Sequence, residues 1–151
     1  KEISSLSDVE CCTLRSRYIS YVYQFFNLIS FLTVKENMCL TSQIKGKKVD
    51  EKELDQVLKL LGLEHKKDSF ANELSGGQQQ RVAIGRAILA HADIILADEP
   101  TGNLDGENAE NVMDILKVLN GKGKTIVLVT HDLKIANYAD RIIRLEQGKI
   151  V

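Results

Sequence analysis

Two short runs, Leu74-Ser75-Gly76-Gly77-Gln78-Gln79-Gln80-Arg81 and Ile94-Ile95-Leu96-Ala97-Asp98-Glu99, indicate how this chain folds. The first leaves the backbone amides of two glycines uncovered directly before a helix-forming stretch. A helix N-terminus with uncovered amides binds anions, most often phosphate. In the second run, four apolar residues precede two acids, as in a buried parallel strand that delivers carboxylates at its carboxyl end. One carboxylate can hold Mg²⁺, and the other can orient or deprotonate a water. Together the runs predict an α/β protein with a nucleoside triphosphate site.

These residues resemble the ATP-binding cassette (ABC) ATPases, whose signature reads L-S-G-G-Q and whose Walker B strand ends in D-E. The resemblance implies a P-loop NTPase-like (RecA-like) parallel sheet with an inserted helical subdomain. In this partial ABC ATPase domain, residues 1–24 and 72–151 would form the core and residues 25–71 the helical subdomain. Within the family, the chain is most similar to the macrolide-exporter and lipoprotein-release branch in Tyr23-Gln24-x-Phe26-Asn27-Leu28, Glu36-Asn37 and Thr101-Gly102-Asn103-Leu104-Asp105. That branch often has a proline where this chain has Ser30-Phe31.

The resemblance further implies ATP and Mg²⁺ as cofactors, and it assigns roles to four residues. Asp98 would hold Mg²⁺, and Glu99 would act on the attacking water. Gln24, at the end of an expected strand, would be a second Mg²⁺ ligand through its amide oxygen. His131 follows a second apolar strand at the same sheet edge and would contact the γ-phosphate of ATP.

The signature residues Ser75, Gly76, Gly77 and Gln78 would bind the ATP of a second domain. In the family, two domains pair head to tail, and each ATP lies between one P-loop and the other domain's signature. Gly77 has no Cβ that would block the approach of a phosphate. The alternative interpretation is that Ser75 only caps its helix. Asp105 has two interpretations of equal standing: a D-loop residue that touches the opposite subunit, or a helix cap.

A P-loop of the form G-x-x-x-x-G-K-[ST] does not occur in this sequence. Gly123-Lys124-Thr125 has Val118 where the first glycine should be, and it leads from a helix into a strand instead of the reverse. We therefore expect a fold that is incomplete at its N-terminus, and a 151-residue fragment that does not hydrolyse ATP by itself.

The implied function is that of the ATP-hydrolysing subunit of an ABC transporter, which couples hydrolysis to a membrane permease. Its partners would be a second ATP-binding domain and the transmembrane permease, with no nucleic acid. Its place would be cytoplasmic, peripheral on the inner face of the cell membrane. The alternative is a truncated, non-hydrolysing interaction module that supplies its signature in trans.

Composition agrees with these expectations. The net charge is −1, with 20 basic and 21 acidic residues, so nothing favours a nucleic-acid surface. No apolar run approaches the roughly 20 residues of a membrane span, and the N-terminus does not resemble a signal peptide. The three cysteines have no metal-ligand spacing and indicate reduced thiols: Cys11, Cys12 and Cys39.

Hydrophobic periodicity and capping signals predict alternating helices and strands. Capping boxes begin a helix at Ser7, ending near Arg15, and another at Asp50, ending at Gly62. Further helices are expected over Val34–Leu40, Ser75–Ala90 and a segment that ends near Gly121. Strands are expected over Ile19–Gln24, Ile94–Asp98 and Thr125–Thr130, with a terminal hairpin of Arg141–Leu145 and Lys149–Val151. The strand–helix–strand order predicts a parallel sheet.

Two surfaces are expected to be unusual. In related folds the P-loop strand lies between the strand ending at Thr130 and a strand around Ile142, so its absence predicts unpaired edges and a marginal monomer. The segment Phe25–Phe31 is rich in large apolar side chains. It is expected either to line a groove for a short permease helix or to fill the core of the subdomain.

Overall fold

A three-stranded parallel sheet lies at the centre of the protein, in a computed structural model that describes residues 2–151. Its strands, in spatial order, are β1 (Ile19–Tyr23), β2 (Ile94–Asp98) and β3 (Thr125–Val129). Asp98 of the central strand β2 pairs with Tyr23 of β1 on one side and with Val129 of β3 on the other. The predicted parallel α/β architecture is therefore confirmed, and the carboxyl ends of all three strands reach the same level.

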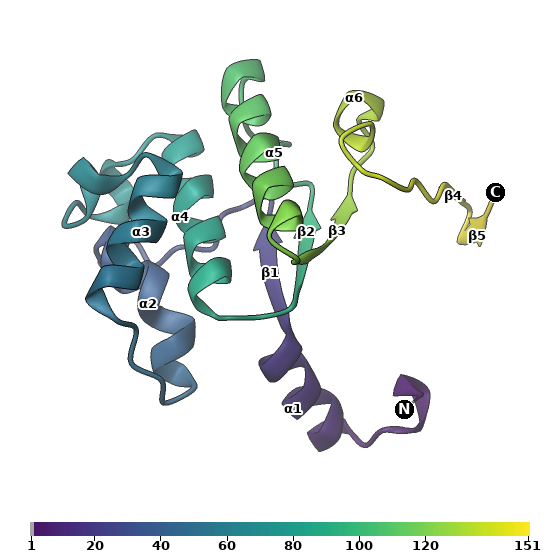
Figure 1. Ribbon diagram of the computed structural model, residues 1–151. Helices are drawn as coiled ribbons and strands as arrows, with labels where there is room; N and C mark the ends of the chain where they lie inside the picture. Colours follow the sequence, from purple (N-terminus) through teal and green to yellow (C-terminus); the bar gives the residue numbers. More distant parts are fainter. Residues whose placement is uncertain (1) are drawn as a thin grey trace.

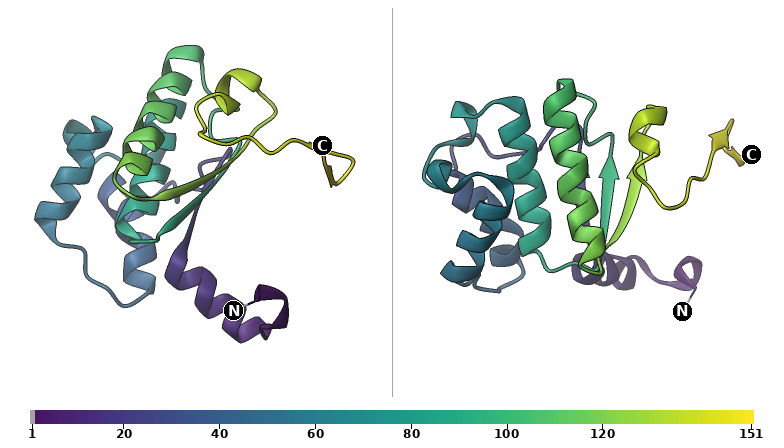
Figure 2. Two further views of the ribbon diagram at one scale, coloured as in Figure 1. Left: turned by 45° about the vertical axis from the view of Figure 1, so that its right-hand side comes forward. Right: turned by 45° about the horizontal axis from the view of Figure 1, so that its top comes forward.

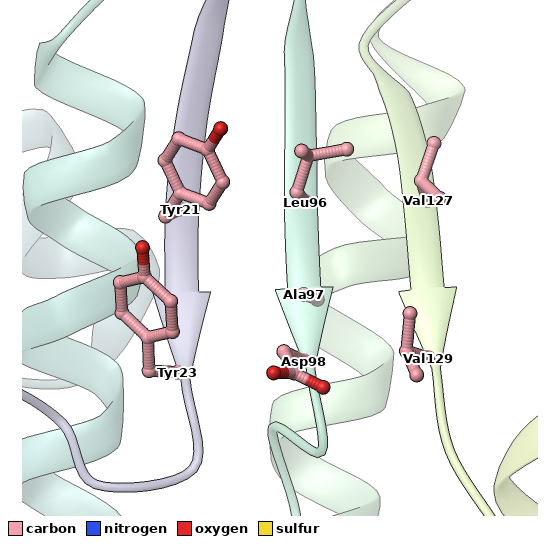
Figure 3. Close-up of a pocket in the computed structure, with 7 residues that line it drawn as sticks. All are labelled: Tyr21, Tyr23, Leu96, Ala97, Asp98, Val127 and Val129. Carbon is pink, nitrogen blue, oxygen red and sulfur yellow. The ribbon is translucent and has the colours of Figure 1, made fainter.

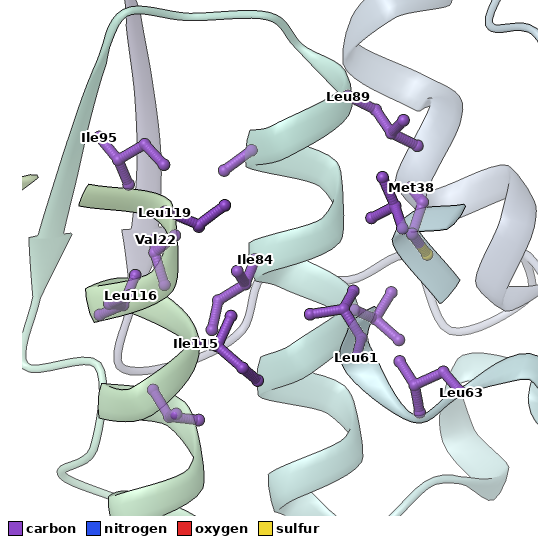
Figure 4. Packing of buried hydrophobic residues seen from close by; sticks show 14 of the residues in the cluster. Val22, Met38, Leu61, Leu63, Ile84, Leu89, Ile95, Ile115, Leu116 and Leu119 are labelled. Carbon is purple, nitrogen blue, oxygen red and sulfur yellow. The ribbon is translucent and has the colours of Figure 1, made fainter. Parts of the chain in front are cut away.

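Helices cover only one face of this sheet (Figure 1). The central pair is α4 (Gly76–Leu89) and α5 (Gly106–Gly121), and α2 (Val34–Ile44) and α3 (Glu51–Leu61) pack on the far side of α4. Alternate strand residues face the helices and are buried, among them Val22, Ile95 and Ala97. One cluster of buried side chains runs from the sheet through α4 to α2 and α3 (Figure 4).

The remaining elements are short or lie at the two ends of the chain. They are η1 (Ile3–Ser5), α1 (Asp8–Tyr18), η2 (Glu64–Lys66), η3 (Ala71–Glu73), α6 (Leu133–Ala136), β4 (Leu145–Glu146) and β5 (Lys149–Ile150). Helix α1 has no buried residue, and it projects from the start of β1 (Figure 2). No helix within residues 2–151 has both the length and the apolar character that crossing a membrane requires.

Several element boundaries differ from the predicted ones. Helix α1 continues past Arg15 to Tyr18, and α2 continues past Leu40 to Ile44. Neither extension contains glycine or proline, and α2 ends only before Gly46, whose φ is +70°. The capping box predicted at Ser7 forms, whereas the Asp50 side chain makes no capping hydrogen bond. Gly62 ends α3 in the left-handed conformation, as expected.

The C-terminal hairpin is shorter than the sequence predicts. Strands β4 and β5 pair antiparallel over two residues each, and the residues around Ile142 form no strand. The hairpin extends away from the body of the protein beside β3 (Figure 1). Strand β3 is therefore one of the two outer strands of the sheet, and no strand within residues 2–151 pairs with its outer edge.

Candidate active site

Four of the predicted site residues lie along the carboxyl edge of the sheet. Gln24 follows β1, Asp98 ends β2 and precedes Glu99, and His131 follows β3 by two residues. The pairing of Tyr23 with Asp98, and of Asp98 with Val129, places these strand ends side by side. Parallel strands bring residues far apart in sequence to one edge, where α/β proteins bind their ligands.

Glu99 is bound at the end of β3 by its backbone and by its side chain. Its N–H donates to the Val129 carbonyl at 2.9 Å, and its φ of +45° turns the chain at the strand end. The carboxylate accepts the His131 N–H at 2.8 Å and the Thr130 hydroxyl at 3.2 Å. A positive φ is uncommon outside glycine, and such strain concentrates at functional sites. The carboxylate therefore has a defined orientation.

The ring of His131 makes the third contact with Glu99. Its Nδ1 lies 2.7 Å from Oε1 of the carboxylate, while the imidazole itself is 87% exposed. The hydrogen bond and the negative charge of Glu99 raise the pKa of His131. This pairing orients the ring and leaves Nε2 without a partner within residues 2–151. When the ring is protonated, Nδ1 donates to Glu99 and Nε2 can donate a proton or a hydrogen bond to an external group.

Asp98 lies on the sheet face that the helices leave bare. Its carboxylate stands at the end of β2 beside the stacked rings of Tyr21 and Tyr23, whose centroids are 5.6 Å apart (Figure 3). Residues Leu96, Ala97, Val127 and Val129 complete the lining of a shallow hollow of about 290 Å³. Within residues 2–151 no hydrogen bond or ion pair engages the Asp98 carboxylate, so it is free to hold a cation.

Gln24 contacts the loop that follows Glu99. Its Nε2 donates to Asn103 Oδ1 at 3.4 Å, and Asn103 Nδ2 donates to the Gln24 carbonyl at 3.0 Å. A Cβ at Gly102 would lie 2.8 Å from Gln24 Nε2, so glycine allows this close approach. The amide oxygen of Gln24 is left available. Oxygen donors of this kind suit Mg²⁺, which takes only a few ligands from a protein when phosphates and waters complete its coordination. The roles of Gln24 and Asp98 as Mg²⁺ ligands stay predictions.

The signature residues form the N-terminus of α4. Ser75 is the N-cap, and its hydroxyl accepts the Gln78 N–H at 3.4 Å. The Gln78 side chain accepts the Ser75 N–H at 3.0 Å, which completes a capping box. Ser75 thus caps α4, as both interpretations of this residue allow. Whether these residues also bind the ATP of a second domain stays a prediction, and the Ser75 hydroxyl proton remains free for such a contact.

The two signature glycines differ in their surroundings. Gly77 is buried, and a Cβ there would come within 2.2 Å of Asn108 Oδ1. The space that a Gly77 side chain would need is thus taken by the Asn108 side chain of α5, and the approach of a phosphate to Gly77 stays a prediction. A Cβ at Gly76 would meet only ordinary contacts, the nearest being Phe26 Cζ at 3.6 Å. Of the two glycines, Gly76 therefore offers the accessible surface.

Asp105 caps α5. Its carboxylate accepts a hydrogen bond from the Asn108 backbone N–H at 2.9 Å. The Asn108 side-chain Nδ2 donates to both oxygens of the same carboxylate, at 2.9 and 3.0 Å. These hydrogen bonds lower the pKa of Asp105. The capping interpretation is confirmed, and contact with an opposite subunit stays a prediction. Asn108 also lies beside Gly77, so one side chain contacts both the Asp105 carboxylate and this signature glycine.

The Gly123-Lys124-Thr125 sequence lies at the amino end of the sheet, opposite to the carboxyl edge. Gly123 turns the chain between α5 and β3 with a φ of +89°. Lys124 donates through Nζ to the Ala92 carbonyl at 2.7 Å, before the start of β2. This lysine is thus held at the amino end of the sheet, and the exclusion of a P-loop at this position is confirmed.

Several residues of the site were not identified from the sequence: Thr130, Gln80, Arg86, Asn103 and Asn108. Thr130 directly precedes His131, and Asn103 lies in the run that resembles a D-loop, so position in the sequence was weak evidence that these two residues belong to the site. Gln80 precedes Ile84 and Ala87 by four and seven residues, which puts a polar residue on the buried face of α4. That pattern could have identified it.

Comparison with known proteins gives consistent results. A family model described as "ABC transporter" matches residues 2–102. The chain is 47% identical over 152 residues to the macrolide export ATP-binding/permease protein MacB of Campylobacter jejuni, which covers 99% of this chain and 24% of that protein. The chain thus spans about a quarter of the length of this curated relative.

Solved structures agree with the sequence relatives. A dimeric bacterial ABC transporter cassette, MJ0796, superposes with a TM-score of 0.82 at 43% identity, over 96% of this chain and 66% of that one. The same cassette in a dimeric post-hydrolysis state bound to ADP and Pi has a TM-score of 0.82 at 42% identity, over 97% of this chain and 66% of that one.

Proposed function

The chain belongs to the ABC transporter family, and we propose that it is part of an ATP-hydrolysing subunit that drives an export permease of the macrolide-exporter kind. The family match and the relatives named above support the ATPase class. The observation that carries the proposal is the Glu99–His131–Thr130 arrangement, at 2.7–3.2 Å, beside the unpaired carboxylate of Asp98. A general base, a polarising imidazole and a cation-binding carboxylate on one sheet edge suit hydrolysis of a phosphoanhydride.

Each residue of this edge has a distinct part in the proposed reaction. Glu99 orients the attacking water and accepts its proton, because its carboxylate is turned out of β2 and held at the end of β3. His131, ordered by Glu99, donates through Nε2 to the γ-phosphate. Asp98 and the Gln24 amide oxygen would hold Mg²⁺, which when bound neutralises the phosphate charge. Thr130 keeps the Glu99 carboxylate in its orientation.

The signature would act on the ATP of a second domain. Within residues 2–151, no hydrogen bond joins Ser75, Gly76 or Gln78 to Asp98, Glu99 or His131. The cassette MJ0796, to which this chain is similar, is dimeric in both solved structures named above. We therefore place Ser75 and Gly76 at a head-to-tail dimer interface, where the N-terminus of α4 faces the γ-phosphate of the partner's ATP.

The phosphate cradle of a P-loop does not occur in these 151 residues, so we propose that this stretch alone does not turn over ATP. The second candidate function, a non-hydrolysing module that supplies its signature in trans, is favoured by the same observation. The two proposals differ in one result. A parent protein that hydrolyses ATP in a Glu99-dependent manner supports the first, and one that only promotes hydrolysis by another subunit supports the second.

The experiment is a Glu99→Gln substitution in the full-length parent. It should lower ATP hydrolysis by about 100-fold or more while ATP binding is retained, since it removes the proton acceptor and the charge that pairs with His131. Glu110→Gln, an exposed change on α5, is the matched control and should hydrolyse ATP at the wild-type rate. Hydrolysis unaffected by Glu99→Gln would refute the proposed role of this edge.

A further inference from the structure

The segment that carries Gln24 has an unusual backbone. Phe26 and Asn27 both have positive φ values, +30° and +49°, and the Asn27 N–H donates to the Phe25 carbonyl across a tight turn. Residues other than glycine adopt such conformations only where the surrounding structure holds them. The turn begins one residue after Gln24, so whatever holds it also influences the position of the Gln24 side chain.

Arg86 holds the far end of this segment. Its two terminal nitrogens donate to the carbonyls of the two strained residues, at 2.6 Å to Asn27 and 2.9 Å to Phe26. Arg86 lies on α4, and burial lowers the pKa of its guanidinium. The planar fork of an arginine can bind two neighbouring oxygens at once, which a lysine ammonium cannot do with the same geometry.

Gln80 holds the near end. Its side chain is completely buried, and Nε2 donates to the Tyr23 carbonyl at 3.3 Å and to the Pro100 carbonyl at 2.7 Å. Its Oε1 has no partner within residues 2–151. A buried amide with one unsatisfied oxygen is unfavourable for stability. The donor side of Gln80 thus joins the end of β1 to the loop after Glu99, which in turn contacts Gln24 through Asn103.

We infer that Gln80 and Arg86 are positioning residues for Gln24, and that the signature helix α4 thereby sets the geometry of the Gln24 amide at the Mg²⁺ site. The inference rests on the proposed function, because it takes the Mg²⁺ role of Gln24 from there. Helix α4 carries the signature at its N-terminus, Gln80 in its second turn and Arg86 near its C-terminal end. A shift of α4 at a dimer interface would therefore move both anchors of the Gln24 segment together.

The first measurement is amide hydrogen exchange across residues 24–28 in the 151-residue chain and in the full-length parent. Arg86→Lys should raise the exchange rate of the Asn27 amide by about tenfold, while α4 amides from Val82 to Ile88 keep their rates. The matched control is Arg17→Lys, because the Arg17 guanidinium lies over the Tyr18 ring on α1. It should change neither the exchange rate of the Asn27 amide nor those of the α4 amides. An unchanged exchange rate at Asn27 would overturn the inference, and so would an equal rise in the exchange rates of the α4 amides.

The second measurement is a double-mutant cycle in the full-length parent. Arg86→Lys should lower kcat about tenfold and raise the half-saturating Mg²⁺ concentration about threefold, and Gln24→Ala should do the same. If Arg86 acts through Gln24, the double variant should be no more than about twofold worse than Gln24→Ala alone. Multiplying effects, or an Arg86→Lys variant with unaltered Mg²⁺ dependence, would show that Arg86 does not act through Gln24.

Gln80→Met keeps the length of the side chain and removes its donor, so it tests the near anchor independently should Arg86→Lys fail to fold. It should also raise the half-saturating Mg²⁺ concentration, and it should be non-additive with Gln24→Ala. If the wild-type parent hydrolyses no ATP, the proposed function is wrong. The exchange measurement would still decide whether Arg86 holds the turn.

Discussion

At the scale of single residues, Glu99 and His131 show how two side chains acquire a joint role. Glu99 leaves β2 with a positive φ, and this brings its carboxylate to the backbone N–H and ring of His131. Adjacent side chains of an extended strand point to opposite faces, so the positive φ changes the direction in which the Glu99 side chain leaves the strand. The turn at Glu99 therefore sets the direction of its carboxylate.

The contact between His131 and Glu99 predicts a pH dependence. Because Glu99 raises the pKa of His131 in the folded state, the contact stabilises the fold fully below the pKa of an unfolded histidine. That contribution is lost as pH rises through the raised pKa. An NMR titration should show the His131 ring titrating at higher pH in wild type than in Glu99→Gln, with His65 as the reference. A His131 pKa that Glu99→Gln leaves unchanged would contradict the pairing.

The signature predicts a second effect at this scale. Gly76→Asp in the full-length parent should leave ATP binding by single subunits intact, because a Cβ at Gly76 fits without displacing its neighbours. The new carboxylate would face the γ-phosphate of the partner's ATP, so ATP-dependent dimerisation and hydrolysis should fall by about 100-fold. Sedimentation with ATP measures the dimer. Gly106→Asp, at the first residue of α5 where a Cβ would meet open space, is the control.

At the scale of elements, the helical part of the chain is connected to the sheet by a well-bonded loop. Asn37 of α2 is fully buried, and its side chain bonds the loop backbone at Ile29, Leu32 and Thr33. This order leaves Phe25 and Phe31 73% and 76% exposed, whereas Phe26 packs near Gly76. Phe25 and Phe31 are therefore better candidates than Phe26 for contact with a permease.

We predict that Phe31→Asp in the full-length transporter uncouples transport from hydrolysis. An exposed aromatic ring adds little to stability, so basal hydrolysis should remain within about twofold of wild type while transport is lost. Transport and ATPase assays on the same vesicles measure the two rates. Phe26→Asp should instead impair hydrolysis too, since its ring lies beside the signature. Loss of folding in Phe31→Asp would place this residue in the core and refute the docking role.

At the scale of the whole molecule, no element within residues 2–151 covers the second face of the sheet (Figure 1). Tyr21, Tyr23, Val127 and Val129 are 36–55% exposed there, and β3 has a free edge. A bare apolar sheet face with an open edge strand promotes association between chains. The expected unpaired edge thus agrees with the outer position of β3, while the marginal stability of the monomer stays a prediction.

We predict that the 151-residue chain by itself is a marginal monomer that associates as concentration rises. Light scattering across a concentration series should show growing particles, and Val129→Lys should reduce them, because a charge on the edge strand opposes pairing. Lys149→Arg, in the exposed terminal hairpin, is the control. A sharp unfolding transition at high temperature from a dilute monomer would contradict this prediction.

Much of this protein follows from local sequence. The apolar strands, the Gly62 helix end and the capping box at Ser7 depend on residues within a few positions of one another, so periodicity and side-chain chemistry predict them. The residues at the strand ends follow as well, because a parallel sheet necessarily brings those ends to one edge. The roles assigned to them came from the resemblance to the ABC family.

Other features depend on contacts between distant parts of the chain. Glu99 is more than thirty positions before Thr130 and His131, which hold its carboxylate. Arg86 is about sixty positions after the Phe26–Asn27 turn that it binds. Gly77 shows the same limit, since glycine at this position fits an open phosphate site as well as the buried contact with Asn108. Local patterns determined which elements form and which edge carries the polar residues. Tertiary packing decided which side chains orient those polar residues, because a hydrogen bond between distant segments exists only once the segments are packed together.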